Sequence, residues 1–143
     1  MCGLTVFYNF PELENEIKYL FSKINNRGPD KQIYKRFNEI NFLFSRLSIQ
    51  DLTDSGDQPI LSNSKKFLIL FNGEIYNHHF LRKKINDERN FNNWCGNSDS
   101  ETLVESFNFF GIEETLGLIR GMYAIILYEF SSNKFYFIND IFG

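Results

Sequence analysis

Apolar and polar residues alternate along the chain in patterns that predict a set of strands. Valine, isoleucine, phenylalanine and tyrosine concentrate in short runs bounded by turn-forming residues, which is typical of strands. One of these runs, residues 67–72, is continuously apolar from Phe67 to Phe71, as expected for a strand buried on both faces. We predict strands at residues 3–9, 32–38, 41–50, 67–72, 122–130 and 134–139.

Helical spacing of apolar residues marks several segments between these strands. A first helix is predicted to begin at Pro11, because a proline in the first turn loses no hydrogen bond, and to end at Ile24. Gly111 separates two later helices, and Asp99 or Ser100 is expected to cap the earlier of the two. The later helices are predicted at residues 77–84, 101–110 and 113–119.

The order of these elements indicates the fold class. Strands and helices fall into groups instead of alternating strictly, which favours an α+β fold with a largely antiparallel sheet. Polar residues predict loops at 51–59 and 87–98, a hairpin turn at 131–133, and a turn at Asn72, Gly73 and Glu74.

Composition adds that the chain can bury a sizeable core. Of its 143 residues, 43% are hydrophobic and 17% are aromatic, which suits one domain. A net charge of −3 leaves no basic excess, so nucleic acid is not expected as a partner.

Targeting signals are not evident in the sequence. The apolar runs are far shorter than the roughly 20 residues that cross a bilayer, and the start of the chain does not resemble a signal peptide. No membrane partner is therefore expected. The two cysteines, Cys2 and Cys95, give no disulfide framework, and we expect a cytoplasmic protein.

Cys2 is the first candidate for chemistry, because removal of Met1 would make it the N-terminal residue. Its α-amino group, with an ordinary pKa of about 7.7–8.0, can then accept the proton of its own thiol, whose ordinary pKa is about 8.5. Nucleophile and base would come from one residue. The alternative is an inert small residue, which is the usual role of a cysteine in second position.

Asn72 and Gly73 are the second candidate, since they directly follow the apolar residues 67–71. The Asn72 side-chain amide and the Gly73 N–H would together supply two donors to an oxyanion. A glycine there also lets a ligand approach the backbone closely. An ordinary Asn-Gly turn is the alternative explanation.

Charged residues provide the remaining candidates. Arg46 lies in an apolar stretch, where a guanidinium needs a carboxylate, either from a structural aspartate or from a ligand. Asp99 either caps a helix or binds an ammonium group of a ligand. A competing metal site would use Cys2, Cys95, His78 and His79. No CxxC or HxxxH spacing supports that metal site, so no metal is expected.

A series of short motifs occurs in one order along the chain. They are Met1-Cys2-Gly3, Arg27-Gly28-Pro29-Asp30, Arg46-Leu47-Ser48-Ile49 followed by Asp51-Leu52, Gln58-Pro59, FNGEIYN at residues 71–77, Ser98-Asp99-Ser100-Glu101 and Gly121-Met122-Tyr123-Ala124. This series resembles the glutaminase domain of glutamine-hydrolysing asparagine synthetases, a class II glutamine amidotransferase of the N-terminal nucleophile type. The resemblance spans nearly the whole chain.

The resemblance implies a four-layer αββα sandwich of two antiparallel sheets and a site that hydrolyses glutamine. Its nucleophile would be Cys2, active only after Met1 is removed. Its oxyanion hole would be formed by Asn72 and Gly73. The residues implied in glutamine binding are Arg46 for the α-carboxylate, Glu74 and Asp99 for the α-ammonium, and Leu47 and Ile49 for the shape of the pocket.

The resemblance also implies a partner that consumes the ammonia. No Ser-Gly-Gly-x-Asp-Ser loop for ATP occurs in the sequence, so no cofactor is expected in this chain. ATP and Mg²⁺ would belong to a synthetase domain or subunit that makes asparagine from aspartate. Two alternatives stay open: a glutaminase that feeds another acceptor in a surface-polysaccharide or natural-product pathway, and a non-catalytic glutamine-binding module.

The end of the chain carries a further expectation. We expect an amidotransferase domain at residues 1–143 that is truncated at its C-terminal end, because further strands follow in the resembling domains. An unpaired sheet edge and exposed apolar surface would then favour self-association, and a homodimer is left open.

Overall fold

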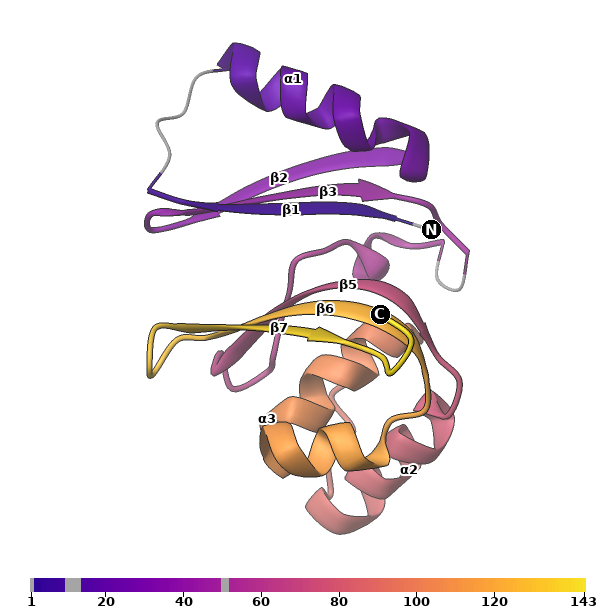
Figure 1. Ribbon diagram of the computed structural model, residues 1–143. Helices are drawn as coiled ribbons and strands as arrows, with labels where there is room; N and C mark the ends of the chain where they lie inside the picture. Colours follow the sequence, from indigo (N-terminus) through magenta and orange to yellow (C-terminus); the bar gives the residue numbers. More distant parts are fainter. Residues whose placement is uncertain (1, 10–13, 50–51) are drawn as a thin grey trace.

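The computed structural model describes residues 2–9, 14–49 and 52–143 (Figure 1). Two separate antiparallel sheets form its centre. The first has the strand order β1-β3-β2, with β1 (Gly3–Tyr8), β2 (Lys31–Phe37) and β3 (Ile40–Arg46). The second has the order β4-β5-β6-β7, with β4 (Ile60–Leu61), β5 (Phe67–Ile75), β6 (Gly121–Glu129) and β7 (Lys134–Asn139).

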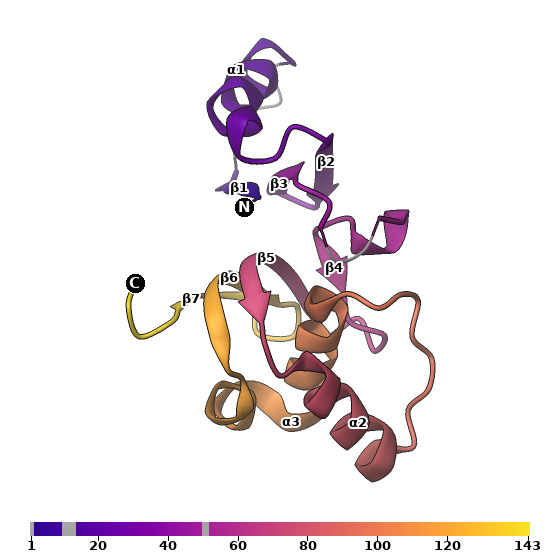
Figure 2. The same ribbon diagram turned by 90° about the vertical axis from the view of Figure 1, so that its right-hand side faces the viewer.

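Helices cover the outer faces of the two sheets. In Figure 1, α1 lies over the first sheet, the two sheets face each other, and α2 and α3 lie beneath the second sheet. Figure 2 shows the same succession of layers from the side. The helices are α1 (Glu14–Ile24), α2 (His78–Arg89) and α3 (Asp99–Leu118), with short 3₁₀ turns η1 (Asn25–Arg27) and η2 (Asp54–Gly56). The predicted four-layer αββα sandwich is confirmed.

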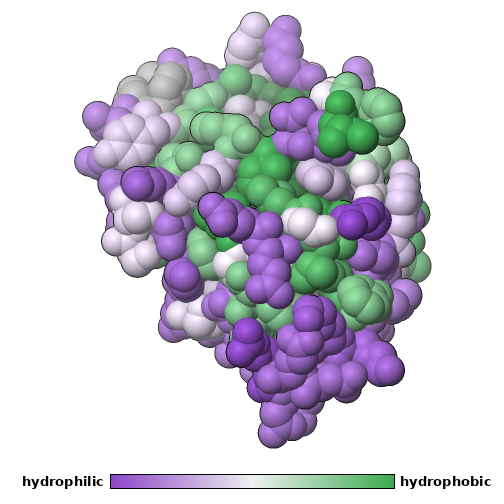
Figure 3. Space-filling view, turned by 60° about the horizontal axis from the view of Figure 1, so that its bottom comes forward, coloured by the Kyte–Doolittle hydropathy of each residue, from purple (hydrophilic) through white to green (hydrophobic). Residues whose placement is uncertain are grey.

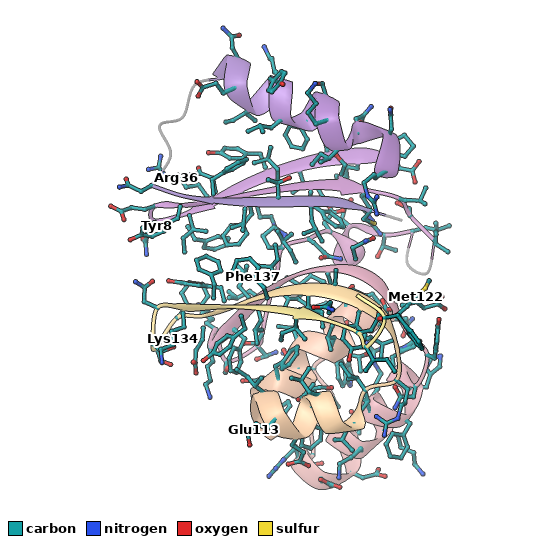
Figure 4. All side chains as sticks on the ribbon, in the orientation of Figure 1. Tyr8, Arg36, Glu113, Met122, Lys134 and Phe137 are labelled. Carbon is teal, nitrogen blue, oxygen red and sulfur yellow. The ribbon has the colours of Figure 1, made fainter. Side chains whose placement is uncertain are left out.

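Strand β5 contributes apolar side chains to two core clusters, one on each face of its sheet. Side chains alternate along a strand, so Phe67, Ile69 and Phe71 pack toward α2 and α3, whereas Leu68 and Leu70 pack between the sheets. Side chains fill the space between the sheets (Figure 4). The predicted burial of residues 67–72 on both faces is therefore confirmed up to Phe71.

The predicted turn at Asn72, Gly73 and Glu74 is wrong. Strand β5 continues through these residues to Ile75, and Gly73 pairs with Tyr123 of β6. Long pairing with β6 outweighs the local turn preference of an Asn-Gly pair. Helix α2 consequently starts at His78, and it runs to Arg89 instead of residue 84.

Other predicted boundaries also shift. The strand predicted at 41–50 ends at Arg46, and β4 and η2 occupy parts of the segment 51–61. Gly111 interrupts α3 with φ 79° and ψ −179°, which confirms two helical segments there. The predicted caps are wrong, because the Ser98 side chain accepts the Glu101 N–H. The predicted helix start at Pro11 lies outside the described residues.

No helix in the described part of the chain has the length and hydropathy needed to cross a membrane.

Candidate active site

A pocket opens where β1 starts and where β3 and β5 end. Every site residue predicted from the sequence lines it: Cys2, Arg46, Leu47, Ile49, Asn72, Gly73, Glu74 and Asp99. Three structural elements that are distant in sequence therefore meet, since Arg46 comes from the first sheet, Asn72 from the second, and Asp99 from the start of α3. The motifs form one site.

Cys2 is partly buried at the start of β1. Its Sγ accepts a hydrogen bond from the Leu47 N–H at 3.3 Å, and its thiol points at the Leu47 carbonyl at 3.7 Å. Arg27 Nε donates to the Cys2 carbonyl at 3.2 Å. These contacts fix the sulfur against the segment that follows β3. Met1 lies outside the described residues.

The Arg27–Asp30 segment contacts the end of β3 and the residues that follow it. Gly28 approaches β3 so closely that a Cβ there would lie 2.0 Å from the Ser45 carbonyl oxygen, which only glycine avoids. The Asp30 N–H donates to the Arg46 carbonyl at 3.0 Å, and Asp30 Oδ2 accepts the Ser48 N–H at 2.7 Å. The motif thus positions the pocket without lining it.

Arg46 is 5% exposed, so its charge needs a partner. Its Nη1 donates to the Thr53 carbonyl at 2.8 Å and to Asp57 Oδ1 at 2.6 Å. The sequence left a structural aspartate and a ligand carboxylate open as partners, and the structure supplies Asp57 as a structural one. Arg46 is also one of the residues that line the pocket.

Asn72 and Gly73 lie on β5 beside β6. Asn72 Oδ1 is buried and has no hydrogen-bond partner among the described residues, which is unusual for a buried amide. Gly73 has φ 151°, and a Cβ there would lie 2.1 Å from the Met122 carbonyl oxygen. The position therefore requires glycine although the chain does not turn.

Asp99 supplies a buried carboxylate from the first turn of α3. It is 6% exposed, and its Oδ2 accepts the Ile75 N–H at 3.0 Å. Burial raises the pKa of Asp99 above its ordinary value, and Glu74 adds to the rise, while the Ile75 N–H opposes it. Glu74 is exposed and lines the same pocket. Two carboxylates so arranged favour a cationic ligand group.

The loop before α3 is held by Glu101. Its carboxylate accepts the backbone N–H groups of Cys95 at 2.6 Å and Gly96 at 3.0 Å, and it forms an ion pair with Arg82 at 3.2 Å. Arg82 also donates to the Gly96 carbonyl at 2.7 Å. The Ser98–Glu101 motif thus combines a helix cap, a pocket carboxylate and a loop anchor.

The competing metal site is not assembled in the described part of the chain. The rings of His78 and His79 on α2 are tilted by 36° to each other, with centroids 3.9 Å apart. Cys95 is exposed, whereas Cys2 lies in the pocket. Among the described residues, no group of three or more His, Cys, Asp or Glu side chains is placed to hold a metal ion.

Sequence reasoning missed two residues next to the site, Asp57 and Gln58. Gln58 is buried and lines the pocket, and its side-chain amide bonds to both backbone groups of Phe71. The need of Arg46 for a carboxylate indicated the following loop, but that loop contains three aspartates, Asp51, Asp54 and Asp57, and the sequence does not select one of them. Gln58 was noted only as part of a motif.

The αββα sandwich of two antiparallel sheets, with a pocket at the strand ends, is the fold of the N-terminal nucleophile class of proteins. Within that class, a family model for the glutamine amidotransferase domain matches residues 1–143. The chain belongs to this glutamine amidotransferase family.

Known relatives are similar to this chain along its whole length. It is 33% and 31% identical to the glutamine-hydrolysing asparagine synthetases 1 and 2 of Bacillus subtilis, and 32% identical to a probable glutamine-hydrolysing asparagine synthetase of Acanthamoeba polyphaga mimivirus. Each alignment covers 100% of this chain. The chain spans only 23%, 19% and 26% of these relatives.

Proposed function

We propose that this chain hydrolyses glutamine to glutamate and ammonia with Cys2 as nucleophile. The observation that carries the proposal is that a thiol, a buried guanidinium and two carboxylates belong to residues of one pocket. A free amino acid carries one anion and one cation at a fixed separation, and this pocket offers Arg46 for the first and Glu74 with Asp99 for the second. Membership of the glutamine amidotransferase family agrees with glutamine as that ligand.

The proposed reaction proceeds in two halves. The α-amino group of Cys2 accepts the thiol proton, and the sulfur attacks the carboxamide carbon of glutamine. The carbon–nitrogen bond breaks, and the nitrogen leaves as ammonia with the proton from the α-amino group. Water then attacks the resulting thioester, the carbon–sulfur bond breaks, and glutamate leaves while the thiol regains its proton.

Asn72 and Gly73 are proposed to stabilise the oxyanion of both tetrahedral intermediates. An Asn72 amide whose Oδ1 is buried in protein would present its NH₂ group as one donor, and the Gly73 N–H would be the other. Donors fixed in advance in a partly dry pocket are worth more than the same donors in water.

Removal of Met1 is part of the proposal. While Met1 is attached, the nitrogen of Cys2 is an amide and cannot accept a proton. The processed chain is therefore the active one, and an intact-mass measurement distinguishes it from the precursor.

The ammonia is proposed to serve asparagine synthesis by a synthetase domain or subunit that uses ATP and aspartate. The similar proteins that carry the name asparagine synthetase support aspartate as the acceptor. The chain matches about a quarter or less of each, so most of each relative lies outside the matched domain.

Cys2→Ala tests the proposed nucleophile, with Cys95→Ala as the matched control. Cys95 is exposed and lies outside the residues that line the pocket. We expect the processed chain and Cys95→Ala to release glutamate from glutamine at the same rate, and Cys2→Ala to release none. Equal release by Cys2→Ala and by the unmodified chain would refute the proposal.

A further inference from the structure

Residues 53–58 connect the two sheets beside the pocket. This segment follows β3 by a few residues, contains η2, and leads into β4 of the other sheet. Two adjacent side chains of the segment, Asp57 and Gln58, bond in different directions. Asp57 bonds to Arg46 of the first sheet, and Gln58 bonds to Phe71 of the second.

The Asp57 side fixes the guanidinium. Asp57 Oδ1 accepts Arg46 Nη1 at 2.6 Å, and Asp57 Oδ2 accepts Lys31 Nζ at 2.5 Å. Lys31 also bonds to Asp54 Oδ1 at 2.7 Å. Asp57 therefore holds Arg46 in place within a group of two cations and two carboxylates. The side chains of Arg46 and Asp57 are 6% and 15% exposed, so their interaction is poorly screened by solvent.

The Gln58 side fixes the backbone before Asn72. Gln58 Nε2 donates to the Phe71 carbonyl at 3.0 Å, and Gln58 Oε1 accepts the Phe71 N–H at 2.5 Å. Within the described residues, strand β4 pairs with Leu68 and Ile69 and does not reach Phe71, so Gln58 takes the place of a neighbouring strand there. The residues after Phe71 are Asn72 and Gly73, the proposed oxyanion donors.

We propose that Asp57 and Gln58 are positioning residues that set the separation between Arg46 and the Asn72–Gly73 donors, and so the length of the amino-acid amide that the site hydrolyses. The inference rests on the proposed glutaminase activity. One rigid peptide bond joins the two residues, so the two ends of the ligand site are linked by a short span of backbone. Glutamine and asparagine differ by a single methylene along that direction.

The two side chains are expected to affect different kinetic constants. Asp57→Asn weakens the hold on Arg46, which acts on the bound α-carboxylate in both the ground state and the transition state. We expect its KM for glutamine to rise about tenfold with kcat within about twofold. Gln58→Met frees the Phe71 backbone beside the oxyanion donors, which act chiefly in the transition state. We expect its kcat to fall at least about tenfold with a smaller change in KM.

Asp54→Asn and Gln32→Met are the matched controls. Asp54→Asn removes the same charge as Asp57→Asn, and both aspartates bond to Lys31. The Asp54 side chain is 91% exposed, however, and its bond is to Lys31 and not to Arg46. Gln32 is exposed on β2, where it bonds to Asn25. Both controls are expected to keep the kinetic constants of the parent chain.

The experiment measures glutamate release from glutamine and aspartate release from asparagine by the processed chain and its variants. Asp57→Asn and Gln58→Met are each expected to lower the preference for glutamine over asparagine at least about tenfold. Gln58→Glu, which keeps the side-chain shape, replaces Gln58→Met if thermal unfolding shows that the latter is not folded.

The outcomes separate this inference from the proposed function. An active parent chain with Asp57→Asn indistinguishable from Asp54→Asn would overturn the inference alone. The inference would also be overturned if the Asp57 and Gln58 variants changed kcat and KM in the same way and kept the preference for glutamine over asparagine. That result would indicate a merely structural role. A processed parent chain without glutaminase activity would overturn the proposed function and the inference with it.

Discussion

Gly73 shows at the scale of one residue how strand geometry and the proposed chemistry depend on each other. Its φ of 151° belongs to a region that glycine adopts readily and other residues rarely do. Gly73 pairs with Tyr123 in this conformation, and a Cβ at this position would lie 2.1 Å from the Met122 carbonyl oxygen. The residue that supplies a proposed oxyanion donor is therefore one that has no room for a side chain.

Gly73→Ala is expected to destabilise the fold by roughly 1–3 kcal/mol and to abolish glutamine hydrolysis, because the added methyl pushes β5 away from β6. Gly117→Ala is the control, since a Cβ at Gly117 of α3 meets no atom within 4 Å. We expect that variant to be unchanged or stabilised by about 0.5–1 kcal/mol. Chemical denaturation measures both, and an active, equally stable Gly73→Ala would contradict the account.

Asp99 predicts a pH dependence of glutamine binding. The proposed partner of the α-ammonium is the ionised carboxylate, and burial raises the pKa of Asp99 above 3.8. Glutamine affinity should therefore fall as the pH decreases through this raised pKa. Asp99→Asn should bind weakly at every pH, and the exposed Asp87→Asn on α2 should keep the dependence of the parent. KM measured between pH 4 and 8 checks this, and an unchanged pH dependence in Asp99→Asn would count against it.

The same carboxylate predicts a trade-off between binding and stability. A folded-state pKa above the unfolded value means that the folded state binds the proton more tightly. Ionisation of Asp99 in the free protein therefore lowers the stability as the pH rises from about 3.8 through the raised pKa. Asp99→Asn, which keeps an acceptor for the Ile75 N–H, should be more stable than the parent at pH 7. Thermal unfolding at pH 4 and pH 7 tests this, and the gain should be absent at the lower pH.

At the scale of elements, the loop between α2 and α3 places Asp99 through contacts that sequence patterns do not report. Arg82 on α2 donates to Gly96 and Asn97, pairs with Glu101, and stacks over the Trp94 ring at 4.1 Å. One side chain on the preceding helix therefore holds the loop against α3.

Arg82→Met should loosen that loop and raise the KM for glutamine severalfold, because Asp99 follows it directly. Lys83→Met removes the same charge from the next residue, which is exposed, and should have no effect. Hydrogen exchange of residues 94–98 provides the second readout. Unchanged exchange in Arg82→Met would show that the loop does not depend on this arginine.

Local patterns predicted most of the strands and helices and failed where distant pairing decides. Residues 67–71 and 134–139 already favour strands by their composition, and their tertiary contacts agree with that preference. Asn72 and Gly73 were misassigned because their pairing with β6 depends on residues some 50 positions away. Asp57 and Gln58 could not be assigned for the same reason, since their partners lie on different sheets.

At the scale of the whole molecule, the sandwich brings motifs from all parts of the chain to one pocket and leaves apolar side chains on its surface. Figure 3 shows hydrophobic side chains exposed among hydrophilic ones on one face of the molecule. Phe137 of the edge strand β7 is 71% exposed and lies between the layers in Figure 4, where its ring stacks on Phe135 with centroids 6.2 Å apart.

Phe137→Ser should reduce self-association of the chain, because an exposed aromatic on the edge strand of a sheet favours contact with another molecule. Tyr19→Ser on α1, with an exposure of 60%, is the control at a helix surface away from a sheet edge. Sedimentation velocity over a range of concentrations measures the effect. Equal association of the parent and Phe137→Ser would refute a role for this edge.

The central claim is that Cys2 forms a covalent intermediate with glutamine. The most direct test is rapid acid quenching of the processed chain during turnover of glutamine, followed by mass spectrometry of its peptides. We predict one γ-glutamyl group on the N-terminal Cys2 peptide, absent from Cys2→Ala and from unreacted chain. Glutamate release without any such adduct, or an adduct on the Cys95 peptide alone, would contradict it.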